Sequence, residues 1–206
     1  MKYRKILNFV LILMVFVSWG KLSFFKADSF MNAQSLGSLK YFTILSNIFE
    51  AIASVVWLIK GNEKLKYAAS VAVGLTFFTV VFFLGRLFGY VSMFAGPSFF
   101  LHGVIPLLSM WEMIFLCKEK MTVGDNISAC LSMIIYGIFY LGNNIINGIG
   151  SWPDTNDWYG FLTWGYPLGF VIYFIMVAAI YLIGLMIRKL MDLVQKKSNK
   201  HLTQGF

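Results

Sequence analysis

Two side chains that can carry out nucleophilic catalysis stand in otherwise apolar segments of the chain. Thr43 lies in YFTILSN (residues 41–47), and His102 lies in LHGVIP (residues 101–106). A neutral histidine in an apolar site can take the proton of a nearby hydroxyl, and the activated oxygen can then attack an acyl carbon. The pair predicts a threonine nucleophile with a histidine base. No acidic residue stands at the right depth to orient His102, so the pattern favours a dyad over a triad.

Further polar side chains accompany this pair in the apolar segments. Asn47 follows Thr43 by four residues, so the two share one helix face. Amide groups and helix N-termini can stabilise negative charge that develops on a substrate oxygen. The side chains predicted to line the site or to support the oxyanion are Ser46, Asn47, Arg86, Asn143, Asn147 and Tyr166.

Each of these residues also has a purely structural interpretation. A threonine in a membrane helix commonly bonds back to its own backbone, and a lone His102 is more often a helix–helix hydrogen-bond donor. Asparagines join membrane helices for about 1 kcal/mol. Arg86 can be an interfacial anchor or a partner for an acidic head group. The prediction of a site therefore depends on the residues lying at one depth.

The composition indicates helices that cross a membrane. The chain has 206 residues, of which 59% are hydrophobic and 13% charged, and its mean hydropathy is +0.74. A soluble domain has roughly 25% charged residues. We predict an all-α bundle of six transmembrane helices in a single domain, because a span needs about 20 apolar residues. The predicted spans are 6–20, 41–59, 67–85, 98–117, 127–148 and 164–187.

The distribution of Lys and Arg predicts the orientation. Thirteen of the 17 basic residues fall in the N-terminus, two loops and the tail 188–206, all on one side of the predicted spans. The positive-inside rule places this side, with both termini, in the cytoplasm. The basic tail predicts contact with anionic lipid rather than with nucleic acid. Residues 1–20 resemble a signal peptide without a clean cleavage site, which favours a retained first helix.

With this orientation, the candidate residues meet near the outer surface of the membrane. Thr43 and Asn47 lie in the first turns of the second span, His102 in the first turns of the fourth, and Asn143 and Asn147 at the outer end of the fifth. At 1.5 Å per residue, these positions fall within roughly 10 Å of one level. Such convergence is expected of a site and is not required by the topology.

Two acidic residues and two cysteines have other predicted roles. Glu50 lies near mid-membrane, where we expect it to be protonated or bonded to a neighbouring helix, with a proton-relay role as the alternative. Glu112 lies toward the cytoplasmic end, where it can snorkel or pair with Lys118. Cys117 and Cys130 face a reducing compartment, so no disulfide is expected. No cofactor or metal site is indicated, because the chain has no cluster of Cys and His.

Two outer connections are long enough to cover the site. The connection 21–40 is expected to pack over the mouth of the bundle. The connection 149–163 mixes turn formers with aromatic residues, carries Asp154 and Asp157, and is predicted to form a partial lid. Anchoring at the membrane interface explains Trp158 equally well.

The motifs around these residues resemble a known family. YFTILSN at the second span, LHGVIP in the fourth and the GYP of WGYPLGF at the sixth are similar to motifs of the androgen-induced protein family and its bacterial relatives. The resemblance implies an intramembrane threonine hydrolase of fatty acid esters of hydroxy fatty acids, in a bacterial cytoplasmic membrane. It also implies that Thr43 is the nucleophile and His102 the base. The continuation ILSN differs from the more acidic mammalian sequence, so the resemblance implies a reaction class rather than a particular lipid.

The sequence thus predicts a membrane hydrolase that takes a lipid ester as its substrate. The rival interpretation is a non-enzymatic lipid-binding or transport protein that uses the same polar residues as a binding site. An ion pump or channel is disfavoured because no repeated halves and no chain of ionisable residues across the membrane are evident. A membrane protein of assembly or sensing without a small ligand is the third alternative.

Overall fold

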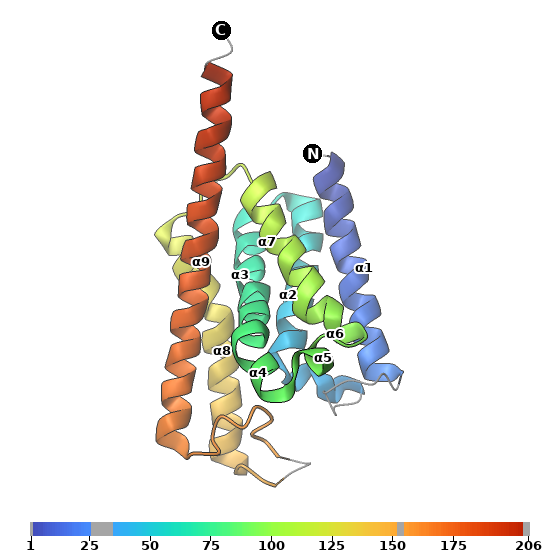
Figure 1. The fold of residues 1–206 in the computed structure, drawn as a ribbon, viewed down its shortest axis with the longest axis vertical. Helices are drawn as coiled ribbons and strands as arrows, with labels where there is room; N and C mark the ends of the chain where they lie inside the picture. Colours follow the sequence, from blue (N-terminus) through green and yellow to red (C-terminus); the bar gives the residue numbers. More distant parts are fainter. Residues whose placement is uncertain (1, 26–34, 152–154, 204–206) are drawn as a thin grey trace.

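The computed structural model describes residues 2–25, 35–151 and 155–203, with side chains as far as Lys197, and within these ranges the chain is helical without strands (Figure 1). Six helical stretches are long and apolar enough to cross a membrane, which confirms the predicted number of spans. The elements in chain order are α1 Lys2–Phe24, η1 Ser35–Lys40, α2 Phe42–Lys60, α3 Glu63–Thr79, η2 Val80–Leu84, α4 Gly85–Phe88, α5 Tyr90–Met93, α6 Pro97–Phe99, η3 Phe100–Val104, α7 Ile105–Leu116, α8 Val123–Asn147 and α9 Tyr166–Thr203.

Helix boundaries follow from local capping chemistry. Gly61, with φ +68°, ends α2 in the left-handed conformation, and its N–H bonds to the carbonyl of Trp57. The Asn62 side chain then accepts the N–H of Leu65 to start α3. Thr122 and Asp125 cap α8 reciprocally, each side chain accepting the other's backbone N–H. These caps satisfy backbone groups that a helix end leaves without a partner.

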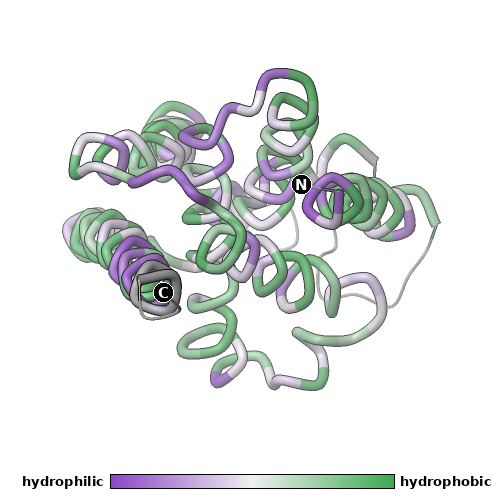
Figure 2. The backbone as a smooth tube through the Cα atoms, turned by 90° about the horizontal axis from the view of Figure 1, so that it is seen from above, coloured by the Kyte–Doolittle hydropathy of each residue, from purple (hydrophilic) through white to green (hydrophobic). Residues whose placement is uncertain are grey.

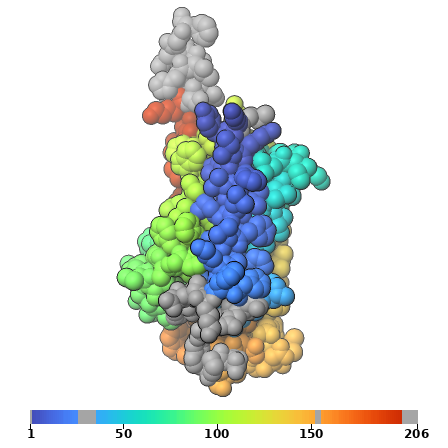
Figure 3. Space-filling view, turned by 90° about the vertical axis from the view of Figure 1, so that its right-hand side faces the viewer, coloured from blue at the N-terminus to red at the C-terminus, as the bar shows by residue number. Residues whose placement is uncertain are grey.

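The bundle is arranged around α3, which packs against α2, α7, α8 and α9. α1 lies on one face, beside α7 and α2 (Figure 3). The start of α1 and the end of α9 lie at the same end of the bundle, here called the proximal end, and the first turn of α2 lies at the opposite, distal end (Figure 1). α9 continues past the bundle at the proximal end.

Large apolar side chains cover the outside of the bundle. Val91, Ile146 and Ile59 have relative exposures of 88, 82 and 74%. Seen along the bundle, the tube is mostly hydrophobic along the helices, with hydrophilic residues at the start of α1 and in connections (Figure 2). In water such a surface would aggregate, whereas lipid tails solvate it.

Two short π-helical segments interrupt the α-helical pattern in the distal half. One, η2, continues α3, and the other, η3, contains His102. In η3 the N–H of Ile105 bonds to the carbonyl of Phe100, five residues earlier. Pro106 has no N–H to offer the carbonyl of His102, which favours this widened turn. Single-turn π-bulges of this kind are often found at functional sites.

Candidate active site

His102 is held in one tautomer by the backbone. Its ring is buried, and Nδ1 lies 2.6 Å from the carbonyl oxygen of Met93. A carbonyl oxygen only accepts hydrogen bonds, so Nδ1 carries the proton and donates it. Nε2 therefore keeps its lone pair, as a general base requires. Met93 supplies the orienting group that no acidic residue provides.

Tight turns between α4 and α6 place the Met93 carbonyl beside the ring. Gly89, with φ +87°, precedes α5, and Gly96, with φ +52°, precedes α6; both angles favour glycine. Phe94 and His102 pack edge to face, with their ring centroids 6.4 Å apart. Apolar packing and a backbone acceptor thus fix the orientation of the imidazole.

Thr43 lies in the first turn of α2 and is also buried. It lines a small cavity of about 30 Å³ together with Thr76, Thr79 and Tyr159. A cavity of this size holds about one water molecule. The hydroxyl of Tyr159 accepts the N–H of Phe42 at 2.8 Å, so it occupies the N-terminus of α2 next to Thr43.

Asn47 connects the backbone of the Thr43 turn to that of the His102 turn. Its Nδ2 donates to the carbonyl of Thr43 at 2.7 Å and to the carbonyl of Leu101 at 3.1 Å. Ser46 also donates to the Thr43 carbonyl, at 3.1 Å, and shares a hydrogen bond of 2.9 Å with Thr76 of α3. Among the described residues, no hydrogen bond joins the Thr43 hydroxyl to the His102 ring. The two turns are therefore joined through Asn47.

The other predicted lining residues lie elsewhere at the distal end. Asn143 donates to Asn156 at 3.1 Å, and Asn147 donates to Asn143 at 2.8 Å, so both support the connection after α8. Tyr166 donates to the carbonyl of Asn144 at 2.9 Å. The side chain of Arg86 is exposed in α4. Within the described part of the chain, no hydrogen bond or ion pair joins Asn143, Asn147, Tyr166 or Arg86 to Thr43 or His102.

The connection after α8 packs onto the first turn of α2 through the bond from the Phe42 N–H to Tyr159. Asp157 is buried; its carboxylate accepts the hydroxyl of Tyr140 and, at 2.8 Å, the N–H of Leu162. Trp158 donates to the hydroxyl of Tyr136 at 2.9 Å. Burial raises the pKa of Tyr159, which keeps its hydroxyl protonated and able to donate. Asp154 and residues 26–34 of the other predicted cover lie outside the described residues.

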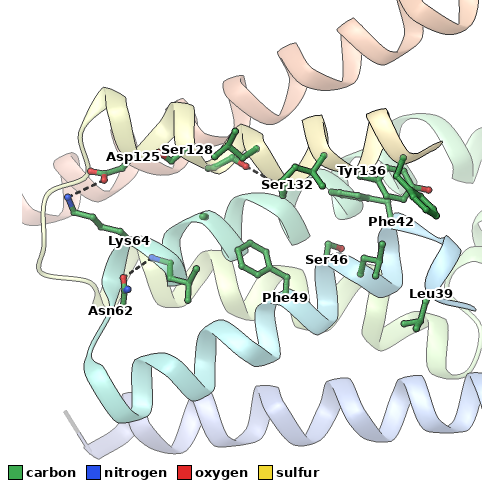
Figure 4. A pocket seen from close by; sticks show the side chains of 17 residues that line it. Leu39, Phe42, Ser46, Phe49, Asn62, Lys64, Asp125, Ser128, Ser132 and Tyr136 are labelled. Atoms are coloured by element: carbon green, nitrogen blue, oxygen red, sulfur yellow. Dashed lines mark hydrogen bonds and ion pairs between the residues drawn. The ribbon is translucent and has the colours of Figure 1, made fainter. Parts of the chain in front are cut away.

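A large apolar groove runs along the bundle between α2 and α8 (Figure 4). Its volume is about 900 Å³, and it extends from Leu39 and Phe42 at the distal end to Lys64 and Asp125 at the proximal end. Phe42 lines both this groove and the small cavity at Thr43. The distal part of the groove and the cavity at the candidate nucleophile thus share Phe42 as a lining residue.

No family model, curated protein or solved structure matches the chain. The resemblance to the androgen-induced protein family consequently stays a prediction from the residues. Among the described residues, no three His, Cys, Asp or Glu side chains come together as metal ligands. The arrangement thus offers an oriented histidine, a buried hydroxyl and an apolar groove, which suit acid–base chemistry on a lipid.

Sequence reasoning missed the residues that orient the site. Nothing in the sequence distinguishes Met93, because its role belongs to its backbone carbonyl. Tyr159 is one of several aromatic residues in its connection, and nothing in the sequence sets it apart from the others.

The predicted pairing of Glu112 with Lys118 is wrong: Glu112 pairs with Arg4 at 2.8 Å and with Lys66 at 3.2 Å. Glu50 bonds to a neighbouring helix, as expected, through Lys66.

Proposed function

We propose that this protein is an intramembrane hydrolase of fatty acyl esters, with Thr43 as nucleophile and His102 as general base. The observation that carries the proposal is the hydrogen bond from His102 Nδ1 to the Met93 carbonyl, which leaves Nε2 unprotonated. The burial of Thr43 and its connection to the His102 turn through Asn47 support the same assignment.

The reaction follows the order of a two-step acyl transfer. Nε2 of His102 takes the proton of Thr43 Oγ1, and Oγ1 attacks the acyl carbon. The bond from that carbon to the alcohol oxygen breaks, and the alcohol leaves with the proton from His102. A water molecule, deprotonated by His102, then attacks the acyl–threonine ester and releases the fatty acid and the free hydroxyl. The Tyr159 hydroxyl, which accepts the Phe42 N–H at the start of α2, is the candidate to stabilise the oxyanion with its own proton.

The groove between α2 and α8 gives the substrate an apolar binding surface. An acyl chain in this groove would reach Phe42, beside Thr43, from within the bilayer. In this proposal the proximal end faces the cytoplasm, the ester lies in the outer leaflet, and the tail 188–206 contacts anionic lipid. The membrane is that of a bacterial cell, as the resemblance implies.

The groove alone would equally serve a lipid-binding or transport protein. The two functions differ in whether the Thr43 hydroxyl becomes covalently modified. Mass spectrometry of the protein after brief incubation with an activated acyl ester, such as a nitrophenyl ester, tests this directly. We expect an acyl adduct on the peptide that contains Thr43 in the wild type, and no such adduct in Thr43→Ala. An unmodified peptide under conditions in which the wild type releases nitrophenol would overturn the assignment.

A further inference from the structure

Five ionisable side chains meet inside the proximal half of the bundle, away from the candidate active site. They are Arg4 of α1, Glu50 of α2, Glu63 and Lys66 of α3, and Glu112 of α7. Four different helices thus contribute to one ion-pair network, here called the charge cluster. The side chains of Glu50, Lys66 and Glu112 are completely buried, and those of Arg4 and Glu63 are 8 and 16% exposed.

Hydrogen bonds stabilise two of the three carboxylates in their ionised form. Glu63 accepts two bonds of 2.6 Å from Arg4 and one of 3.0 Å from Trp57. Oε1 of Glu112 accepts from Arg4 at 2.8 Å and from Asn8 at 2.7 Å; its Oε2 makes no hydrogen bond but lies 3.2 Å from the Lys66 ammonium, whose charge it faces. Charge-assisted bonds of this number favour the carboxylate over the acid.

Glu50 has fewer hydrogen-bond donors around its carboxylate than Glu63 and Glu112 have. Its Oε1 contacts the Lys66 ammonium and lies 3.5 Å from the Ser54 hydroxyl, whereas Oε2 is buried without a hydrogen-bond partner. The Lys66 ammonium donates to Oε1 of Glu50 and to the Ser54 hydroxyl, and it forms an ion pair with Glu112 at 3.2 Å. No cationic donor among the described residues is therefore left over for Oε2 of Glu50.

The charge cluster contains one more acid than base. Three carboxylates face two cations, so full ionisation would leave one net negative charge in an apolar interior, where an uncompensated charge is costly. The other polar side chains that face the charge cluster are Asn8, Ser54, Trp57, Ser109 and Cys117. None carries a positive charge, and burial raises the pKa of the Cys117 thiol to about 12, so it stays neutral.

We propose that the charge cluster is a proton-binding site that holds one exchangeable proton on Oε2 of Glu50. The proton removes the excess charge and gives the unpartnered oxygen an O–H group. A metal ion or another monovalent cation fits this position poorly, because the Lys66 ammonium already lies between the carboxylates of Glu50 and Glu112. Glu63, the most exposed member, marks the proximal end as the side from which the proton exchanges. This site does not depend on the proposed ester hydrolysis.

Infrared spectroscopy of the purified protein at neutral pH tests the proposal through the carbonyl stretch of a protonated carboxylic acid. We expect the wild type to show this band, and we expect it to shift in D₂O because the proton exchanges. Glu50→Gln should lose the band. Glu112→Gln should lose it too, since two carboxylates would then face two cations. Lys66→Met should raise its intensity about twofold, because two protons are then needed to compensate the charge.

Glu119→Gln is the matched control, because Glu119 is an exposed acid on the connection after α7, outside the charge cluster. Its band should equal that of the wild type. A wild type without a protonated-acid band at neutral pH would overturn the proposal, and so would an undiminished band in Glu50→Gln. If Glu50→Gln fails to fold, the wild type still decides the matter: its band must disappear when the protein is denatured at the same pH.

Discussion

His102 donates its Nδ1 proton to the carbonyl oxygen of Met93 across 2.6 Å, nine residues earlier in the chain. This bond links the chemistry of the ring to the backbone of the turns between α4 and α6. A carbonyl acceptor orients an imidazole without adding a charge to the apolar site. The expected consequence is a base that stays neutral and competent within the bilayer, without the acid of a triad.

Asn47 is expected to hold the candidate site together. Asn47→Ala removes two hydrogen bonds and leaves the buried carbonyls of Thr43 and Leu101 without that partner. We expect a loss of about 1–2 kcal/mol in the free energy of unfolding, measured by thermal or denaturant unfolding in detergent. Asn147→Ala is the control, because this side chain is exposed and, in the described part of the chain, donates a hydrogen bond only to Asn143. Equal losses in the two variants would contradict the role given to Asn47.

Arg4 is expected to stabilise the bundle far more than its neighbour Lys5. Arg4→Met leaves the carboxylates of Glu63 and Glu112 without their main partner, and unpairing a buried charge costs about 3–5 kcal/mol. Lys5 is exposed on the same turn, so Lys5→Met should change stability by less than about 0.5 kcal/mol. Unfolding midpoints of the two variants in the same detergent give the comparison. Similar midpoints would show that the ion pairs of Arg4 contribute little.

Close packing of α8 on α9 predicts different effects for two glycines of α8. A methyl group at Gly137 would collide with the ring of Tyr173, whereas one at Gly142 meets nothing within 4 Å. Gly137→Ala should therefore lose about 1–3 kcal/mol, because the Tyr173 ring must move. Gly142→Ala should match or exceed wild-type stability, since alanine favours a helix. A tolerated Gly137→Ala would mean that α8 and α9 lie further apart than described.

The groove between α2 and α8 is expected to select the acyl chain. Ser132 lines it about midway along α8, so Ser132→Phe should block the proximal half (Figure 4). We expect hydrolysis of long-chain esters to fall about tenfold relative to short-chain esters, measured as the ratio of kcat/KM values. Ile138→Phe, on an exposed position of α8 outside the groove lining, is the control and should leave the ratio unchanged. An unchanged ratio in Ser132→Phe would exclude the groove as the acyl site.

The six spans could be predicted from the sequence because a run of about 20 apolar residues has few other stable states. The ends of the spans are predicted less accurately: the third predicted span begins at residue 67, whereas α3 begins at Glu63. The sequence predicts Lys64 and Lys66 in a loop, because charged residues normally avoid the bilayer. Lys66 is in fact completely buried, since Glu50 and Glu112 compensate its charge.

The pairings between helices could not be predicted, because they depend on how the helices are rotated and placed. Arg4 and Asn8 lie one helical turn apart in α1, and both donate to Glu112, which lies more than a hundred residues away in the sequence. The π-turn at His102 follows from Pro106, but the approach of the Met93 carbonyl depends on the turns before it. Asn47 bonds to the backbone of the Thr43 turn and of the His102 turn, and the joint role of Thr43 and His102 stays a prediction.

The central claim is tested most directly by the rate at which purified variants release fatty acid from a panel of lipid esters. The wild type, Thr43→Ala, His102→Gln and the control Thr79→Ala, whose side chain lines the same small cavity, are compared after confirming equal folding. We expect turnover by the wild type and Thr79→Ala, and at least about a hundredfold loss in Thr43→Ala and His102→Gln. Full turnover in Thr43→Ala would contradict the assignment of the nucleophile.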